Sequence, residues 1–101
     1  MENVLNEVRA EREAQNRKWG QQDHNLVEWI AILTEEVGEA AKEAVDFHFY
    51  NGLVKSISPI EKRSIQFERL QAYRKECIQV AAVAVQMVES LDRYLEEIVE
   101  P

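Results

Sequence analysis

The chain has 101 residues, of which 46% are hydrophobic and 31% are charged, and its net charge is −7. This length suits one domain, which we expect over residues 1–101, and the balance is too apolar for an intrinsically disordered chain. Binding to duplex nucleic acid depends on Lys and Arg side chains that displace counterions, so the negative charge argues against DNA or RNA as a partner. With three Gly and two Pro, the composition favours long helices and an all-α fold.

The first predicted helix covers residues 2 to about 18. It lacks breakers and has a weak apolar stripe, so we expect it to be mostly exposed. Gly20 ends it, since glycine is the usual residue just past the carboxyl end of a helix. The polar connection 21–25 then offers Asp23 or Asn25 as the cap of the next helix.

The second predicted helix runs from about Leu26 to His48 and ends before Asn51-Gly52. The segment 51–59 shows no period, which predicts a loop. Within the helix, apolar residues recur at spacings of three and four, which places them on one face that we call the apolar seam and expect to form the core. They are Leu26, Ile30, Leu33, Val37, Ala41 and Ala44.

A long helix is predicted from about Phe67 to Val99, and a short helix begins after Ser58-Pro59 because proline suits the first helical position. The long helix continues the seam with Leu70, Cys77, Ala81, Ala84, Val88, Leu91 and Leu95. Its middle, CIQVAAVAVQMV, is apolar almost all round, which indicates burial on more than one side. We therefore expect a bundle of two long and one or two shorter helices per chain, completed by oligomerisation to a homodimer or homotetramer.

The sequence predicts neither export nor a membrane partner. Its most apolar stretch covers 12 residues, 77–88, well short of the roughly 20 that cross a bilayer. The amino terminus lacks a basic-then-apolar signal, and the single cysteine, Cys77, has no partner for an intrachain disulfide. We expect a cytoplasmic protein in which Cys77 is a buried, inert thiol.

Glutamates gather on the second helix in the run TEEVGEAAKEA. At about 100° per residue, Glu36, Glu39 and Glu43 share a strip with Trp29 at the edge of the apolar seam. Like charges three or four residues apart cost a helix about 0.2–0.5 kcal/mol per pair, so a cation should offset them. Gly38 costs about 1 kcal/mol relative to Ala and would let another helix or a ligand approach closely.

Two further oxygen donors, Glu76 and Gln79, lie three residues apart on the long helix. Glu76 stands at the entrance to the apolar run, where a carboxylate without a partner is unfavourable or becomes protonated. Two such pairs on packed helices are a common way to build a carboxylate metal site in a bundle. Oxygen donors without suitably spaced Cys or His fit Mg²⁺, with Mn²⁺ as a substitute. The alternative is that these acids form a solvated face.

These motifs resemble those of the MazG-like all-α nucleotide pyrophosphohydrolases, in particular their phage-type branch. Family members carry EExxE on one helix and ExxD on a later one, which residues 35–39 and 76–79 resemble. The segment KWGQQDHNL at 18–26 and the run ECIQVAAVAV also resemble family segments, so the resemblance covers about residues 12–92. One departure is Gln79, which stands where most members have Asp and carries one negative charge less.

The resemblance implies hydrolysis of nucleoside triphosphates, or their deoxy forms, to the monophosphate and pyrophosphate, as nucleotide-pool housekeeping. It implies that Glu36, Glu39 and Glu76, with Gln79, hold Mg²⁺. Glu35 would orient or deprotonate the attacking water. Metal ions suit this chemistry because they bridge phosphate oxygens and stabilise the charge that develops during the reaction.

Nearby cations and aromatic residues are candidates for contact with the substrate. Lys18 and Arg74 are candidates for the phosphates, with a solvated surface as the alternative. Trp19 and Trp29 are candidates for stacking on the base. For Trp29, packing in the core is at least as strong an interpretation. The rival function is a non-catalytic helical oligomer that senses nucleotides or binds a partner.

Overall fold

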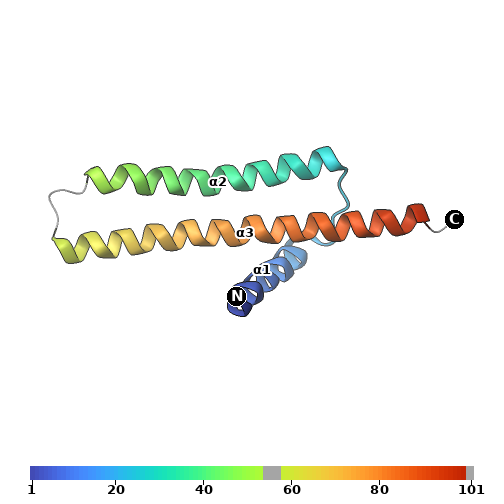
Figure 1. Ribbon diagram of the computed structural model, residues 1–101, viewed down its shortest axis with the longest axis horizontal. Helices are drawn as coiled ribbons and strands as arrows, with labels where there is room; N and C mark the ends of the chain where they lie inside the picture. The colour runs from blue at the N-terminus through green and yellow to red at the C-terminus, as the bar shows by residue number, and fades with distance from the viewer. Residues whose placement is uncertain (54–57, 100–101) are drawn as a thin grey trace.

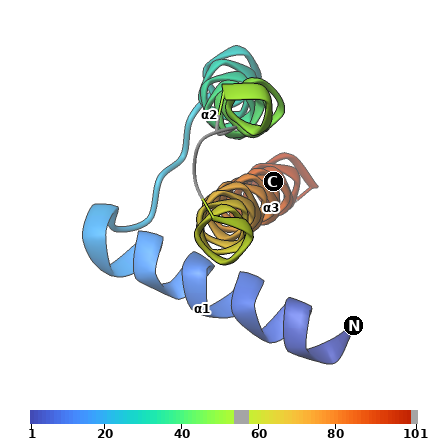
Figure 2. The same ribbon diagram turned by 90° about the vertical axis from the view of Figure 1, so that its left-hand side faces the viewer.

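The computed structural model describes residues 1–53 and 58–99, and the regular elements within them are all α-helices. They are α1 (Glu2–Trp19), α2 (Leu26–Leu53) and α3 (Pro59–Val99). α2 and α3 lie side by side and antiparallel (Figure 1), and α1 crosses α3 on the side away from α2 (Figure 2). The predicted all-α class, with two long helices and a shorter one, is confirmed.

Local capping residues set the boundary between α1 and α2. Gly20 has a φ of 74°, in the left-handed region that favours glycine, and its N–H donates to the carbonyl of Asn16 at 2.8 Å. Asn25, rather than Asp23, caps α2. Its side-chain oxygen accepts from the N–H of Glu28 at 2.8 Å, and the Glu28 carboxylate accepts from the N–H of Asn25 at 3.0 Å.

The predicted end of α2 is wrong, because Asn51 and Gly52 belong to the helix, which continues to Leu53. A single glycine costs a helix only about 1 kcal/mol, which contact with a neighbouring helix readily outweighs. α2 runs beside α3 as far as this end (Figure 1). Of the predicted loop, residues 54–57 lie outside the described residues.

α3 begins at Pro59 and is one continuous helix of 41 residues. The short and long helices predicted on either side of Phe67 are therefore a single element. Ser58 caps it, since its hydroxyl accepts from the N–H of Glu61 at 3.2 Å. No Gly or Pro follows Pro59 within the helix, so nothing local stops it before Val99.

The core of the described chain is small and lies where α2 meets α3. Its buried residues are Trp29, Ala82, Val83, Gln86 and Ser90. On α2 the strip that begins at Trp29 turns towards α3, so the strip predicted at the edge of the apolar seam is the one that packs within the chain.

The apolar seam itself stays open, which corrects its assignment as a core face. On α2, Leu26, Ile30 and Val37 are 69%, 54% and 47% exposed, and on α3 Val88 is 57% exposed. Cys77 is exposed as well, rather than buried as predicted. The reason is geometric, because α2 lies along one side of α3 and α1 crosses it on another (Figure 2), which leaves most seam residues uncovered while Leu33, Ala81 and Ala84 are half-buried.

Among the described helices, none has an apolar stretch that is long enough to span a membrane. Gln79 and Gln86 interrupt the apolar run of α3, and Gln86 is buried. The close approach predicted at Gly38 is also not made within the described chain, where a Cβ at this residue would meet nothing within 4 Å.

Candidate metal centre

Three carboxylates from two helices converge between α2 and α3. Glu36 and Glu39 lie one turn apart on α2, and Glu76 lies on α3. One oxygen of each lies within 4.8 Å of the others. Their spacing of three residues puts the two α2 side chains on one face, and the antiparallel pairing brings Glu76 opposite them. We call Glu36, Glu39 and Glu76 the acidic cluster.

The acidic cluster places negative charges close together and partly out of water. Burial raises the pKa of Glu36, and the charges of Glu39 and Glu76 raise it further. Burial likewise raises the pKa of Glu76, followed by the effect of Glu39. The Oε2 atoms of Glu36 and Glu76 are both buried and have no hydrogen-bond partner within the described part of the chain. Uptake of a proton or binding of a cation would each relieve this cost.

The donor set fits Mg²⁺. All three groups offer carboxylate oxygen, the ligand type that hard divalent cations prefer. The two buried oxygens without partners are the structural sign of this fit, because a bound cation would satisfy both. Gln79 is half-buried one turn from Glu76, and Glu35 is exposed next to Glu36.

The two predicted phosphate-binding cations lie in different surroundings. Arg74 forms a two-pronged ion pair with Glu7 of α1, with one contact of 2.8 Å between Nη1 and Oε1, and this pairing lowers the pKa of Glu7. Its guanidinium is thus committed to α1 rather than to the acidic cluster. Lys18 instead places its ammonium 4.7 Å from the centre of the Trp19 ring.

A hollow of about 260 Å³ adjoins the acidic cluster and shares Glu36 with it. Both predicted tryptophans line it, although Trp19 is 60% exposed and Trp29 only 3%. Trp29 is therefore a core residue that offers part of its ring to the hollow. All three helices and the connection 20–25 contribute to the lining, which consists of Gln15, Trp19, Gln22, His24, Trp29, Ile32, Glu36, Val83 and Gln86.

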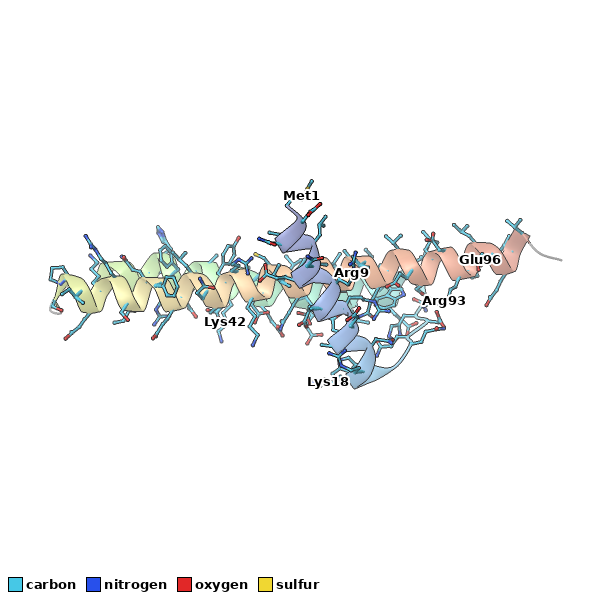
Figure 3. The ribbon with its side chains drawn as sticks, turned by 90° about the horizontal axis from the view of Figure 1, so that it is seen from below. Met1, Arg9, Lys18, Lys42, Arg93 and Glu96 are labelled. Carbon is cyan, nitrogen blue, oxygen red and sulfur yellow. The ribbon has the colours of Figure 1, made fainter. Side chains whose placement is uncertain are left out.

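Contacts with α3 hold the connection and Trp29 in place. The indole N–H of Trp29 donates to the hydroxyl of Ser90 at 3.2 Å, and the ring of His24 meets Trp29 edge-on at 4.9 Å. Arg93 donates to Asp23 at 2.8 and 3.0 Å. Figure 3 shows Arg93 on α3 beside the connection that follows Lys18. These contacts position the wall of the hollow.

Several residues of this region were not anticipated from the sequence. Ser90 and Arg93 lie on α3 without a recognisable motif, and Gln15 lies in a polar stretch of α1. Gln86 alone carried a signal, because it is polar within an apolar run and has to satisfy its amide if it is buried.

Comparisons of the chain with protein-family models, curated proteins and solved structures find no significant match. The resemblance of residues 35–39 and 76–79 to known motifs therefore stands on these residues and their surroundings. Since one fold class hosts many functions, the function has to be argued from the site.

Proposed function

We propose that the chain is a Mg²⁺-dependent pyrophosphohydrolase of nucleoside triphosphates or their deoxy forms. The observation that carries the proposal is the convergence of three carboxylates within 4.8 Å, two of them with a buried oxygen that lacks a partner among the described residues. Such a cluster gains most from a hard divalent cation. The resemblance of its motifs to those of MazG-like enzymes supports the same activity.

The side chains have distinct roles in this proposal. Glu36, Glu39 and Glu76 hold Mg²⁺, which when bound neutralises phosphate oxygens and activates water. Gln79 adds an uncharged oxygen, so the site carries one negative charge less than a site of four carboxylates. Glu35 is exposed beside the cluster, where it orients the attacking water or accepts its proton.

The hollow next to the cluster suits the base of the nucleotide. Trp19 and Trp29 offer aromatic surface there, and Glu36 joins the hollow to the cluster. Its described lining contains neither Lys nor Arg, which favours an uncharged group. Of the two candidate cations, Lys18 lies against the ring of Trp19, which lines the hollow, whereas Arg74 is engaged with Glu7.

The test of the activity is an assay of pyrophosphate release from each nucleoside and deoxynucleoside triphosphate with millimolar Mg²⁺. We expect release from at least one of them and none after chelation of the metal. If the folded protein released no pyrophosphate from any nucleotide, the proposed activity would be wrong.

The test of the site uses charge-neutral variants of similar size. Glu36→Gln and Glu76→Gln should each lower kcat/KM by about 100-fold or more, because each removes a metal ligand. Glu96→Gln is the matched control, since Glu96 is exposed near the carboxyl end of α3 (Figure 3), more than five helical turns beyond Glu76, and its loss should leave the rate unchanged. Full activity in both cluster variants would contradict the assignment of the site.

We also propose that copies of the chain assemble through the apolar seam as a homodimer or homotetramer. The radius of gyration is 17.9 Å, against about 13 Å for a compact chain of this length. The accessible surface is 7813 Å², against about 5,900 Å² for a compact protein of 11.8 kDa. The excess of roughly 1,900 Å² is more than the roughly 800 Å² that each partner buries in a standard interface.

The exposed thiol of Cys77 on the seam supports a proposal about the cellular compartment of the protein. In an oxidising compartment a free, exposed thiol on an interface would form disulfides between copies. We therefore place the protein in the reducing cytoplasm. Fractionation of cells that produce it, followed by detection of the chain, tests this placement.

The open seam also favours a second candidate, a helical oligomer without catalysis that senses nucleotides or binds a partner. The two functions differ in their response to metal. A ligand that binds the folded state alone raises the melting temperature. No shift with millimolar Mg²⁺, either alone or with a non-hydrolysable nucleotide, would favour the second candidate.

A further inference from the structure

Two glutamine side chains join α1 to α3 at the wall of the hollow. Gln86 is 8% exposed, and its amide nitrogen donates to the carbonyl oxygen of Gln15 at 2.6 Å. Both residues line the hollow beside Glu36. A buried amide that loses its hydrogen-bond partners destabilises the fold by roughly 1–3 kcal/mol. Leu or Met at the same position would have no polar group to satisfy. The position therefore points to a use for the amide.

The orientation of both amides follows from Glu11 at the end of the chain of hydrogen bonds. An ionised carboxylate can only accept, so the amide nitrogen of Gln15 turns towards Glu11, at 3.3 Å. The carbonyl oxygen of Gln15 then faces Gln86, which has to present its amide nitrogen in return. The carbonyl oxygen of Gln86 accepts no hydrogen bond within the described part of the chain, so in the lining of the hollow it is the atom of this amide that is left for a ligand.

The rest of the hollow fits a flat, uncharged ligand with a hydrogen-bonding edge. Trp19 and Trp29 supply aromatic surface, and the volume is about 260 Å³. An acceptor fixed in this wall favours a ligand that presents a donor there. It disfavours one that presents another acceptor, because two carbonyl oxygens then face each other without a proton.

We propose that Gln86 selects the base of the nucleotide by accepting a hydrogen bond from an exocyclic amino group, such as that of cytosine or adenine. Gln15 and Glu11 act as positioning residues that hold this acceptor in place. The inference rests on the proposed function, since it requires a nucleotide with its phosphates at the acidic cluster and its base in the hollow.

The experiment compares nucleotides that differ only in the amino group. CTP is paired with its analogue that lacks the 4-amino group, and ATP is paired with purine riboside triphosphate. We expect the wild-type protein to prefer the amino form by at least about tenfold in kcat/KM in a pair that it hydrolyses. Gln86→Met keeps the volume of the side chain and removes the amide, so the preference should fall to within about twofold.

Glu11→Gln is the second variant and leaves Gln86 in place. An amide at position 11 can donate as well as accept, so the direction of the hydrogen bonds is no longer set and the preference should fall in part. Gln71→Met is the matched control, since Gln71 is exposed on α3 and does not line the hollow, and it should leave the preference unchanged. A purely structural role of Gln86 would lower all rates alike without altering the preference.

An unchanged preference in Gln86→Met, or a wild type without preference, would overturn the inference while leaving the activity intact. If the wild type releases no pyrophosphate, the proposed function fails, and binding decides the inference separately. The probe is then the α,β-imido analogue of each nucleotide, titrated calorimetrically with Mg²⁺. A dissociation constant at least about tenfold lower for the amino form, lost in Gln86→Met, supports the inference, and equal constants overturn it.

Discussion

Glu36 shows how partial burial sets the chemistry of a single side chain. Burial raises its pKa from the ordinary value of 4.5 more than the charges of Glu39 and Glu76 do. A carboxyl with a raised pKa binds more protons in the folded than in the unfolded state. Its contribution to stability is therefore complete below about pH 4.5 and is lost as the pH rises through the raised pKa.

Glu36→Gln should accordingly stabilise the metal-free protein at pH 7.5. We expect the melting temperature to rise by about 2–4 °C, because the variant removes the cost of burying a charge together with several repulsions of about 0.2–0.5 kcal/mol each. The gain should shrink as the pH falls and vanish near pH 4.5. Thermal melts in a chelator across this range measure it, with Glu96→Gln as the control. A gain that stays the same at pH 4.5 would contradict the account.

Ser90 provides a second test at the scale of the residue. Its hydroxyl accepts from the indole of Trp29 at 3.2 Å, and the two residues are 5% and 3% exposed. Ser90→Ala leaves the indole donor unsatisfied, which costs about 1–2 kcal/mol and lowers the melting temperature on the order of 5–10 °C. Ser64→Ala, at an exposed serine of the same helix, is the control. Equal melting temperatures for the two variants would show that the bond contributes nothing.

At the scale of the element, α1 is the least firmly attached helix. None of its residues is buried. Polar contacts join it to α3: the ion pair of Arg74 with Glu7, that of Arg12 with Glu89, whose atoms lie 2.6 Å apart, and the hydrogen bond between Gln86 and Gln15. Exposed ion pairs contribute little to stability and are screened by salt. α1 should therefore open more readily than the packed part of α3.

Raising the salt concentration should reveal the difference in stability between α1 and the packed part of α3. On raising NaCl from about 0.05 to 0.5 M, amide hydrogen exchange should speed up several-fold in residues 5–19, because screening weakens the attachment of α1. Exchange in residues 80–90 of α3 should hardly change, since that segment contains most of the core, and it serves as the internal control. The same response in both segments would mean that α1 is held by something other than its ion pairs.

At the scale of the whole molecule, the main feature is the exposed apolar surface of the seam, through which we propose that copies assemble. Val88 is 57% exposed in the middle of the seam on α3, whereas Val4 is 45% exposed on α1. Val88→Glu should prevent assembly, because it places a charge in an apolar interface, while Val4→Glu should leave assembly unchanged. Analytical ultracentrifugation should give a multiple of 11.8 kDa for the wild type and 11.8 kDa for Val88→Glu. A monomeric wild type would refute the proposed assembly.

The sequence by itself determined the features that depend on one or two helical turns. It predicted an all-helical chain, the end of α1 at Gly20 and the grouping of Glu36 with Glu39 on one strip. Capping and periodicity act between residues at most four apart, so a single segment contains the whole signal. The sequence also predicted that Glu76 joins Glu36 and Glu39, because residues 35–39 and 76–79 each carry oxygen donors three residues apart. The structure places Glu76 in the acidic cluster.

Only the tertiary structure decided which face of each helix is covered and which distant side chains meet. It turned the Trp29 strip towards α3 and left the apolar seam open, joined Arg74 to Glu7 and paired Gln15 with Gln86. It also carried α2 through Gly52, which local propensity alone places at a break. The physical reason is that the rotation of a helix about its axis, and the crossing of α1 over α3, follow from the sum of many weak contacts between elements, and no single segment contains that sum.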